Sequence, residues 1–279
     1  IEKVKKTILP LLQNKKIEKI GYDLKNVGNC LCDDNHFLQT PYFDIKIAAY
    51  LLNPSQQDYT ITKIIQEYLK QGNKIATDKN QKDKDMSEKE KEICWQAKLL
   101  IPLKKNLQSL LQENNLDSLY QDVELPLIQV IQQMEKTGIK LDTAFLKEMS
   151  QKFSKNINNI KKEIFKIAGE EFNLNSPKQL SHILFHKLKL PTSKKIKTGY
   201  STNAQVLNKL SEKHEVVAKI LNYRELEKLK NTYIDKLPKL INSKTGRLHT
   251  CFNQTGTSTG RLSSNNPNLQ NIPIRTELG

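Results

Sequence analysis

The chain has 279 residues, which is enough for one large domain or two domains of ordinary size with a hydrophobic core. Its formal charge of +15 and its pI near 9.5 indicate a polyanionic partner or an anionic surface. The sequence has no run of about 18 apolar residues and no apolar stretch after its basic start, so we expect a soluble protein that is not exported.

Cysteine usage indicates a reducing compartment. The four cysteines are too few and too scattered for a disulfide framework in a chain of this length. Cys30, Cys32 and His36 offer three zinc ligands, but no second Cys/His pair lies nearby in the sequence to complete a site. We therefore expect a cytoplasmic protein with no metal bound by this chain.

The first hundred residues alternate helix and strand patterns. Residues 4–12 form a basic amphipathic helix that leads into a short strand at 19–23. Residues 43–53 are continuous apolar helix material with Asp44 near the start, and residues 61–69 form a second amphipathic helix. This alternation predicts part of an α/β layer.

A polar segment separates these elements from the helices that follow. Residues 78–92 are almost wholly polar with mixed charge and can bury too little to offset chain ordering, which predicts a solvated loop leading into a helix. Apolar residues then recur at helical spacing over 116–137, and Gly138 is a stop signal.

The longest helix signal starts at Asp142, a capping residue, and ends at Gly169. At about 1.5 Å per residue this helix is roughly 40 Å long. Its apolar stripe predicts a core face and comprises Leu146, Met149, Phe153, Ile157, Ile160, Ile164 and Ile167.

Two capping patterns flank a basic tip in the next segment. Ser176 to Gln179 reads as a capping box with Pro177 at the first helical position, and Thr202 to Gln205 repeats the pattern. Residues 190–201 between them carry three lysines and predict a mobile loop. A long helix over 215–241 then carries basic residues that include Arg224, Lys228, Lys230, Lys236 and Lys239.

The positive charge is concentrated in the second half of the chain. Residues 1–105 hold 19 basic and 14 acidic side chains, a net of +5, whereas residues 178–275 hold 18 basic and 5 acidic, a net of +13. The surface that meets a polyanion is therefore expected in the second half.

Residues 259–276, TGRLSSNNPNLQNIPIRT, are the most specific run in the sequence. The run contains too much turn chemistry for a helix interior, so it predicts extended backbone that presents polar side chains. It closely resembles the segment of family A DNA polymerases, of the bacterial DNA polymerase I type, that enters the palm just before the first catalytic aspartate. The resemblance extends upstream through most of the chain.

The resemblance implies a three-part organisation. Residues 1–115 are similar to part of a 3′–5′ exonuclease domain with a ribonuclease H-like α/β fold, residues 116–245 to the mainly α-helical thumb, and residues 246–279 to the first strands of the α+β palm. Because the chain begins at Ile1 rather than Met and stops directly after the run, we expect a segment of a longer protein.

The exonuclease-like part departs from the active family pattern. The family run Gly-Gln-Asn-x-Lys-aromatic-Asp supplies a metal-binding aspartate, but the matching residues, Gly21 to Val27, end in a valine. The helix that corresponds to Tyr-x-x-x-Asp, residues 92–100, contains no aspartate. We therefore expect a vestigial domain without proofreading.

The resemblance also implies DNA contacts. In the thumb, Asn173 and Ser176 at a helix start, and Arg224 and Lys228 on the long helix, match positions that touch the duplex backbone, where a helix N-terminus favours phosphate. In the run, Arg261 matches the residue that reaches the minor groove at the primer end. The other matching DNA-binding positions are Ser263, Asn268, Gln270, Asn271 and Arg275.

Catalysis is expected from residues outside this chain. In the family, carboxylates that follow the point where the chain stops hold the Mg²⁺ ions for nucleotidyl transfer, so the chain alone should be inactive. The implied function of the complete protein is DNA-directed DNA polymerisation in replication and repair, by a cytoplasmic bacterial monomer that uses primer-template DNA and deoxynucleoside triphosphates. A non-enzymatic duplex-DNA-binding protein and an active 3′–5′ exonuclease are the alternatives.

Overall fold

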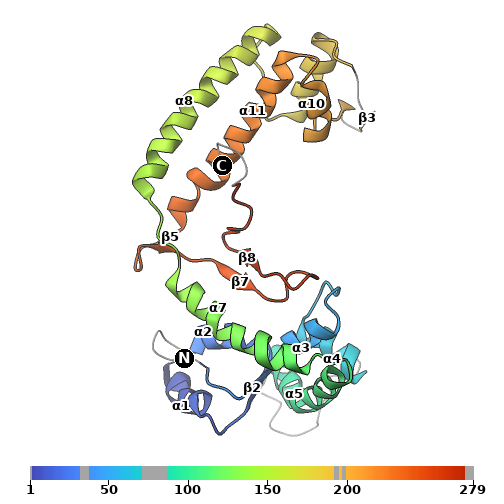
Figure 1. Cartoon of the computed structure of the whole chain (residues 1–279), viewed down its shortest axis with the longest axis vertical. Helices are drawn as coiled ribbons and strands as arrows, with labels where there is room; N and C mark the ends of the chain where they lie inside the picture. The colour runs from blue at the N-terminus through green and yellow to red at the C-terminus, as the bar shows by residue number, and fades with distance from the viewer. Residues whose placement is uncertain (1, 32–37, 71–86, 192–194, 197–198, 274–279) are drawn as a thin grey trace. The chain divides into compact units, whose positions relative to one another are not determined.

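The computed structural model describes residues 2–31, 38–70, 87–191, 195–196 and 199–273. The chain divides into two compact units (Figure 1). The first comprises Ile1–Gly138 with His249–Gln270, and the second comprises Ile139–Leu248 with Asn271–Gly279. The boundaries of these units differ from those of the three parts that the resemblance implies. The three-part division assigns segments by function and stays a prediction.

A two-stranded parallel sheet lies near the start of the first unit. Helix α1 (Glu2–Gln13) precedes strand β1 (Lys19–Gly21), and helix α2 (Leu24–Leu31) follows it. Strand β2 (Tyr42–Asp44) pairs with β1, with Phe43 opposite Ile20. The expected helix over 43–53 therefore begins later than its apolar pattern indicates, because pairing with β1 draws its first residues into a strand.

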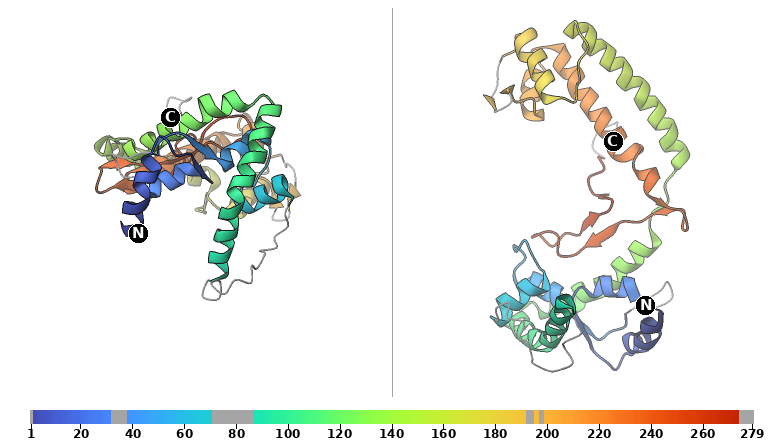
Figure 2. Two further views of the ribbon diagram at one scale, coloured as in Figure 1. Left: turned by 90° about the horizontal axis from the view of Figure 1, so that it is seen from below. Right: turned by 180° about the vertical axis from the view of Figure 1, so that it is seen from behind.

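Three helices cover this sheet region. Helix α3 (Ile45–Leu52) is capped by Asp44, whose side chain accepts from the N–H groups of Lys46 and Ile47. Helix α4 (Ile61–Leu69) has the predicted bounds. Both pack against helix α5 (Glu88–Glu113), as Figure 2 shows from a second side.

The next helical segment contains a π-helical turn. It runs through α6 (Asp117–Leu119), the π turn η2 (Tyr120–Glu124) and α7 (Leu125–Thr137). Gly138 ends it as predicted, with a φ of 62°. Among the apolar residues at helical spacing on this segment, Ile131 is buried but Val123, Val130 and Met134 are exposed.

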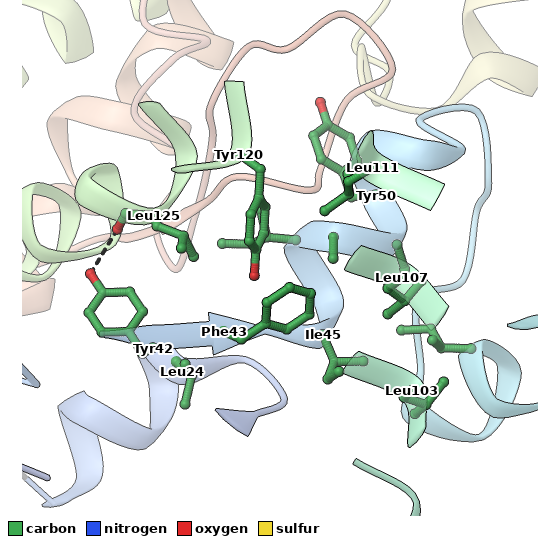
Figure 3. Packing of buried hydrophobic residues seen from close by; sticks show 14 of the residues in the cluster. Leu24, Tyr42, Phe43, Ile45, Tyr50, Leu103, Leu107, Leu111, Tyr120 and Leu125 are labelled. Atoms are coloured by element: carbon green, nitrogen blue, oxygen red, sulfur yellow. Dashed lines mark hydrogen bonds between the residues drawn. The ribbon is translucent and has the colours of Figure 1, made fainter. Parts of the chain in front are cut away.

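Aromatic side chains form the centre of the core of the first unit (Figure 3). The rings of Phe43 and Tyr120 pack with centroids 5.0 Å apart. The Tyr42 hydroxyl donates to the Leu125 carbonyl at 2.8 Å, and the Tyr120 hydroxyl accepts from the Asp44 N–H at 2.8 Å. Burying each such ring stabilises the fold by about 1.5–3 kcal/mol, and these hydrogen bonds satisfy its polar end.

Helix α8 (Thr143–Ala168) is the longest element of the second unit and lies beside helix α11 (Glu215–Leu229) (Figures 1 and 2). Its predicted ends are confirmed. The Asp142 side chain accepts from the Phe145 N–H, and Gly169 closes the helix with a φ of 72°. The predicted stripe is buried or half-buried, so it is a core face.

Short elements connect α8 to α11. They are α9 (Pro177–Ser181), the π turn η3 (His182–Lys187), strand β3 (Lys195–Ile196), strand β4 (Gly199–Tyr200) and α10 (Ala204–Leu210). Strands β3 and β4 pair antiparallel. Residues 192–194 and 197–198 of the tip predicted at 190–201 lie outside the described residues.

The two predicted caps are only partly correct. Ser176 caps α9 by accepting from the Gln179 N–H, but the Gln179 side chain accepts from the Asn173 N–H instead of closing a capping box. The cap of α10 is Asn203 rather than Thr202, because the Asn203 side chain accepts from Val206.

The helix expected over 215–241 is not continuous. After α11 the chain forms the π turn η4 (Lys230–Ile234) and the 3₁₀ helix η5 (Leu237–Leu240). Strand β5 (Ile241–Asn242) then pairs antiparallel with β6 (Arg247–Leu248). Among the described residues, none of the helices has the length and hydrophobicity that crossing a bilayer requires.

Candidate nucleic-acid interface

An antiparallel hairpin in the first unit holds the start of the run that resembles the palm. Strand β7 (Cys251–Asn253) pairs with β8 (Ser263–Asn265), with Phe252 opposite Ser264. We call Cys251–Asn265 the β7–β8 hairpin. Its loop carries Arg261.

One threonine fixes the hairpin loop. The Thr257 hydroxyl donates to the Arg261 carbonyl at 2.8 Å and accepts from the Arg261 N–H at 3.1 Å. Gly260 has a φ of 74°, which a side chain would strain, so glycine suits the turn before Arg261. The exposed Arg261 guanidinium makes no hydrogen bond or ion pair within the described residues. The loop therefore orders the backbone and leaves this cation available.

The turn after β8 is organised by Gln270. Its side-chain oxygen accepts from the Ser264 N–H at 3.2 Å, and its amide nitrogen donates to the Leu262 carbonyl at 2.5 Å. The Ser264 hydroxyl is buried and accepts from the Leu269 N–H, and the Asn268 side chain accepts from the Gln270 N–H. The side chains of Asn268 and Gln270, two residues that the resemblance assigns to DNA binding, thus also shape this turn.

The described residues of the run differ in exposure. Arg261, Asn268, Gln270 and Asn271 are exposed and Ser263 is half-buried, while Arg275 lies outside the described residues. The Asn271 carbonyl, in the second unit, accepts a hydrogen bond from the Tyr233 hydroxyl.

Asn173 and Ser176 occupy the turn before α9. The Asn173 side chain accepts from the Asn175 N–H at 2.9 Å, and its carbonyl accepts from the Ser176 N–H at 3.0 Å. Asn173 is exposed and Ser176 is half-buried. The Asn175 amide donates to the Glu227 carboxylate on α11 at 2.9 Å. This bond brings the two predicted backbone-binding positions beside α11.

Arg224 and Lys228, both on α11, differ in environment. The Arg224 guanidinium is half-buried and donates to the Thr202 carbonyl at 2.6 Å, and burial lowers its pKa from the ordinary value. Lys228 is exposed. Arg224 therefore has a structural bond that Lys228 lacks in the described part of the chain.

The residues that resemble an exonuclease motif form a turn and the start of α2. Asp23 has a φ of 55° and pairs with Lys46 at 2.8 Å. Val27 is half-buried on α2. Across the described ranges, no three His, Cys, Asp or Glu side chains converge on a point that could hold a metal ion, and the residues of helix 92–100 lie within α5. The described residues of this part therefore do not bring together the ligands of a two-metal site.

Asp44 is the most buried carboxylate of this region. It accepts hydrogen bonds from the N–H groups of Leu24, Lys46 and Ile47. Burial nevertheless raises the pKa of Asp44 to about 6, because loss of water outweighs these donors. A hollow of about 180 Å³ lies between it and the hairpin, lined by Asp23 and Cys251 among others.

Several residues that hold the hairpin were not found from the sequence. The Tyr50 hydroxyl donates to the Thr257 carbonyl at 2.9 Å, and Gln254 donates to Glu124. Lys25 pairs with Glu135 at 2.5 Å. These partners lie 207, 130 and 110 positions apart, so no local pattern could have indicated them.

Comparison with known families gives two matches. Residues 143–279 match the family described as DNA polymerase family A. Residues 2–82 match the family described as DNA polymerase I, ribonuclease H-like domain. The fold is thus a ribonuclease H-like α/β part followed by a polymerase part, as the resemblance implied.

Individual relatives agree with these matches. The chain is 43% identical to DNA polymerase I of Caldicellulosiruptor bescii over 94% of this chain and 29% of the relative. It is 44% identical to the thermostable DNA polymerase I of Thermus caldophilus, over 92% of this chain and 30% of the relative. The chain therefore spans less than a third of the length of these relatives.

A solved structure is also similar. The POL domain of Pol1 from M. smegmatis, in complex with DNA primer-template and dNTP, aligns with a TM-score of 0.81 and 32% identity. The alignment covers 98% of this chain and 46% of that one.

Proposed function

Because the chain belongs to DNA polymerase family A, we propose that the complete protein extends a DNA primer on a DNA template. The observation that carries this proposal is the fixed loop of the β7–β8 hairpin, which presents the exposed Arg261 inside the segment that matches the polymerase family. A guanidinium is charged at any working pH and is a good donor to groove acceptors.

Within the complete protein, residues 1–115 are the ribonuclease H-like part, residues 116–245 the thumb and residues 246–279 the start of the palm. The thumb binds the duplex backbone without sequence specificity, since contacts to phosphate carry no information about the bases. Asn173 and Ser176 at the start of α9 and Lys228 on α11 supply these contacts. The net charge of +13 over residues 178–275 supports this role.

At the primer end, Arg261 lies in the minor groove and Ser263, Asn268, Gln270, Asn271 and Arg275 contact nearby backbone. Purine N3 and pyrimidine O2 offer acceptors in nearly the same place for both A·T orientations, so a donor there senses the shape of the base pair rather than its sequence. The bonds of Gln270 to Ser264 and Leu262 support a fixed backbone at this point.

The chemical step belongs to other residues of the complete protein. There, Mg²⁺ held by carboxylates would supply the activation of the primer hydroxyl and the neutralisation of phosphate charge. The chain of 279 residues does not polymerise by itself. The complete protein uses deoxynucleoside triphosphates and acts as a monomer in the bacterial cytoplasm.

Proofreading is absent from the complete protein. Val27 stands where the exonuclease pattern has a metal-binding aspartate, and the α5 segment 92–100 carries no aspartate. A valine side chain has no donor atom for a metal, so two-metal hydrolysis lacks ligands.

The test of the proposed function is primer extension by the complete protein. With a labelled primer-template, four deoxynucleoside triphosphates and Mg²⁺, we expect products whose length follows the template. Binding of the duplex without extension would instead support the alternative of a non-enzymatic DNA-binding protein.

A further inference from the structure

Lys25 is a buried cation with three partners. Its side chain is 9% exposed. The ammonium contacts Glu135 Oε1 at 2.5 Å, the Phe252 carbonyl oxygen at 2.6 Å and Cys251 Sγ at 3.4 Å. Two of these three partners belong to strand β7.

Glu135 binds the same strand from helix α7. Its Oε1 accepts from the Phe252 N–H at 2.7 Å, and its Oε2 accepts from the Asn29 amide at 2.7 Å. The Glu135 backbone carbonyl also lies 2.8 Å from His249 Nδ1, just before β7. A carboxylate that accepts this many bonds is held in one orientation.

Lys25 and Glu135 therefore act as the partner of the free edge of β7. Phe252 lies opposite Ser264 of β8, and its C=O and N–H groups bind Lys25 and Glu135 respectively. Buried backbone groups on a strand edge need partners, and a third strand would normally supply them. Here two oppositely charged side chains replace that strand.

Two more contacts extend this attachment along the hairpin. The Gln254 amide donates to the Glu124 carbonyl at 3.0 Å and to its carboxylate at 2.9 Å. The Tyr50 hydroxyl donates to the carbonyl of Thr257, the residue that fixes the Arg261 loop. The hairpin is thus attached at intervals from β7 up to the loop.

We propose that Lys25 and Glu135 are positioning residues for primer extension: they fix the β7–β8 hairpin so that Arg261 meets the primer end. This role rests on the proposed function. The run Gly21 to Val27 then has a function that needs no metal ligand, because its Lys25 holds strand β7 of the palm-like hairpin.

The first arm of the test measures how well the hairpin is protected from hydrogen exchange, and it needs no enzymatic activity. Hydrogen exchange is followed in the complete protein and in Lys25→Met, with Lys104→Met as the matched control. Lys104 pairs with Glu18 in the same unit, and within the described residues its side chain makes no hydrogen bond or ion pair with the hairpin. We expect the exchange rate of the amides of residues 251–265 to rise roughly tenfold in Lys25→Met only. This factor corresponds to the loss of one charged hydrogen bond. Unchanged exchange there, or an equal rise in the control, would overturn the proposal.

The second arm measures extension of a matched primer at saturating nucleotide, together with Tm. Lys25→Met leaves Glu135 buried without its cation and should lower both quantities, extension by roughly tenfold. Adding Glu135→Gln removes that stranded charge, so the double variant should regain Tm while extension stays low, because the Phe252 carbonyl still lacks its ammonium. If the double variant recovers both extension and Tm, the pair of Lys25 and Glu135 only stabilises the fold, and the proposal is wrong. If the wild-type protein does not extend primers, the proposed function fails, and hydrogen exchange still decides whether the pair fixes the hairpin.

Discussion

Gly28 on α2 and Gln132 on α7 meet so closely that a Cβ added to the glycine would lie 2.2 Å from Gln132 Nε2. Gln132 is 1% exposed, and its amide donates to the Lys25 carbonyl at 2.9 Å, so it cannot move aside without breaking this bond. We expect Gly28→Ala to lower the free energy of unfolding by about 1–3 kcal/mol, the usual cost of overpacking. Urea unfolding measures this change.

Removing the obstructing amide supplies the control for that prediction. In a Gln132→Ala background the added methyl group meets space, so Gly28→Ala should cost clearly less than in the wild type. Equal costs in the two backgrounds would show that the close approach is not the cause.

The buried carboxylate of Asp44 predicts a dependence of stability on pH. Its pKa is about 6 in the folded protein and about 3.9 in an unfolded chain, so the folded state binds the proton more tightly between these values. The contribution of Asp44 to stability is therefore complete below pH ~4 and is lost as the pH rises through ~6.

Asp44→Asn removes this titration while keeping a capping oxygen. The free energy of unfolding of the wild type minus that of Asp44→Asn should fall from pH ~4 to ~6 and level off above pH ~7. Chemical unfolding at several pH values measures the difference. A difference that rises over this window would mean that the three N–H donors outweigh burial.

The two basic residues predicted to touch DNA on α11 should behave differently. Arg224→Ala removes the bond to the Thr202 carbonyl and should cost about 1–2 kcal/mol of stability, because the half-buried group is charged. Lys228 is exposed, so Lys228→Ala should leave Tm unchanged and lower the slope of log K against log salt by about 0.9. Calorimetry and duplex binding at several salt concentrations separate the two. An unchanged Tm for Arg224→Ala would contradict its structural assignment.

Absence of proofreading is a direct prediction for the complete protein. Incubation with a mismatched 3′ end and Mg²⁺, without nucleotides, should leave the primer at full length, because Val27 offers no metal ligand. Gel electrophoresis of the labelled primer is the measurement. Shortening that requires the metal would show that acidic residues other than those expected hold the ions.

Elements set by local chemistry were predictable from the sequence. The bounds of α4, the Asp142 cap and the Gly169 stop of α8 all follow from spacing and capping residues. Features set by distant partners were not. Phe43 joins a strand because it pairs with Ile20, and no local pattern indicates that pairing.

The candidate site divides in the same way. The run around Arg261 was recognisable because its residues are contiguous. Its attachment was not, since Lys25 reads locally as one lysine of a degenerate motif and Glu135 as a solvated helix residue. The buried ion pair between them exists only once α2, α7 and β7 have packed together.

The most direct test of the account compares Arg261→Ala with the wild type of the complete protein on matched and mismatched primers. A lost charged hydrogen bond of about 1.5–3 kcal/mol corresponds to a roughly 10- to 100-fold slower extension of the matched primer. A mismatched end already displaces the groove acceptors, so its extension should slow much less. An equal loss on both primers, accompanied by a lower Tm, would show that Arg261 only stabilises the loop and would contradict its contact with the primer end.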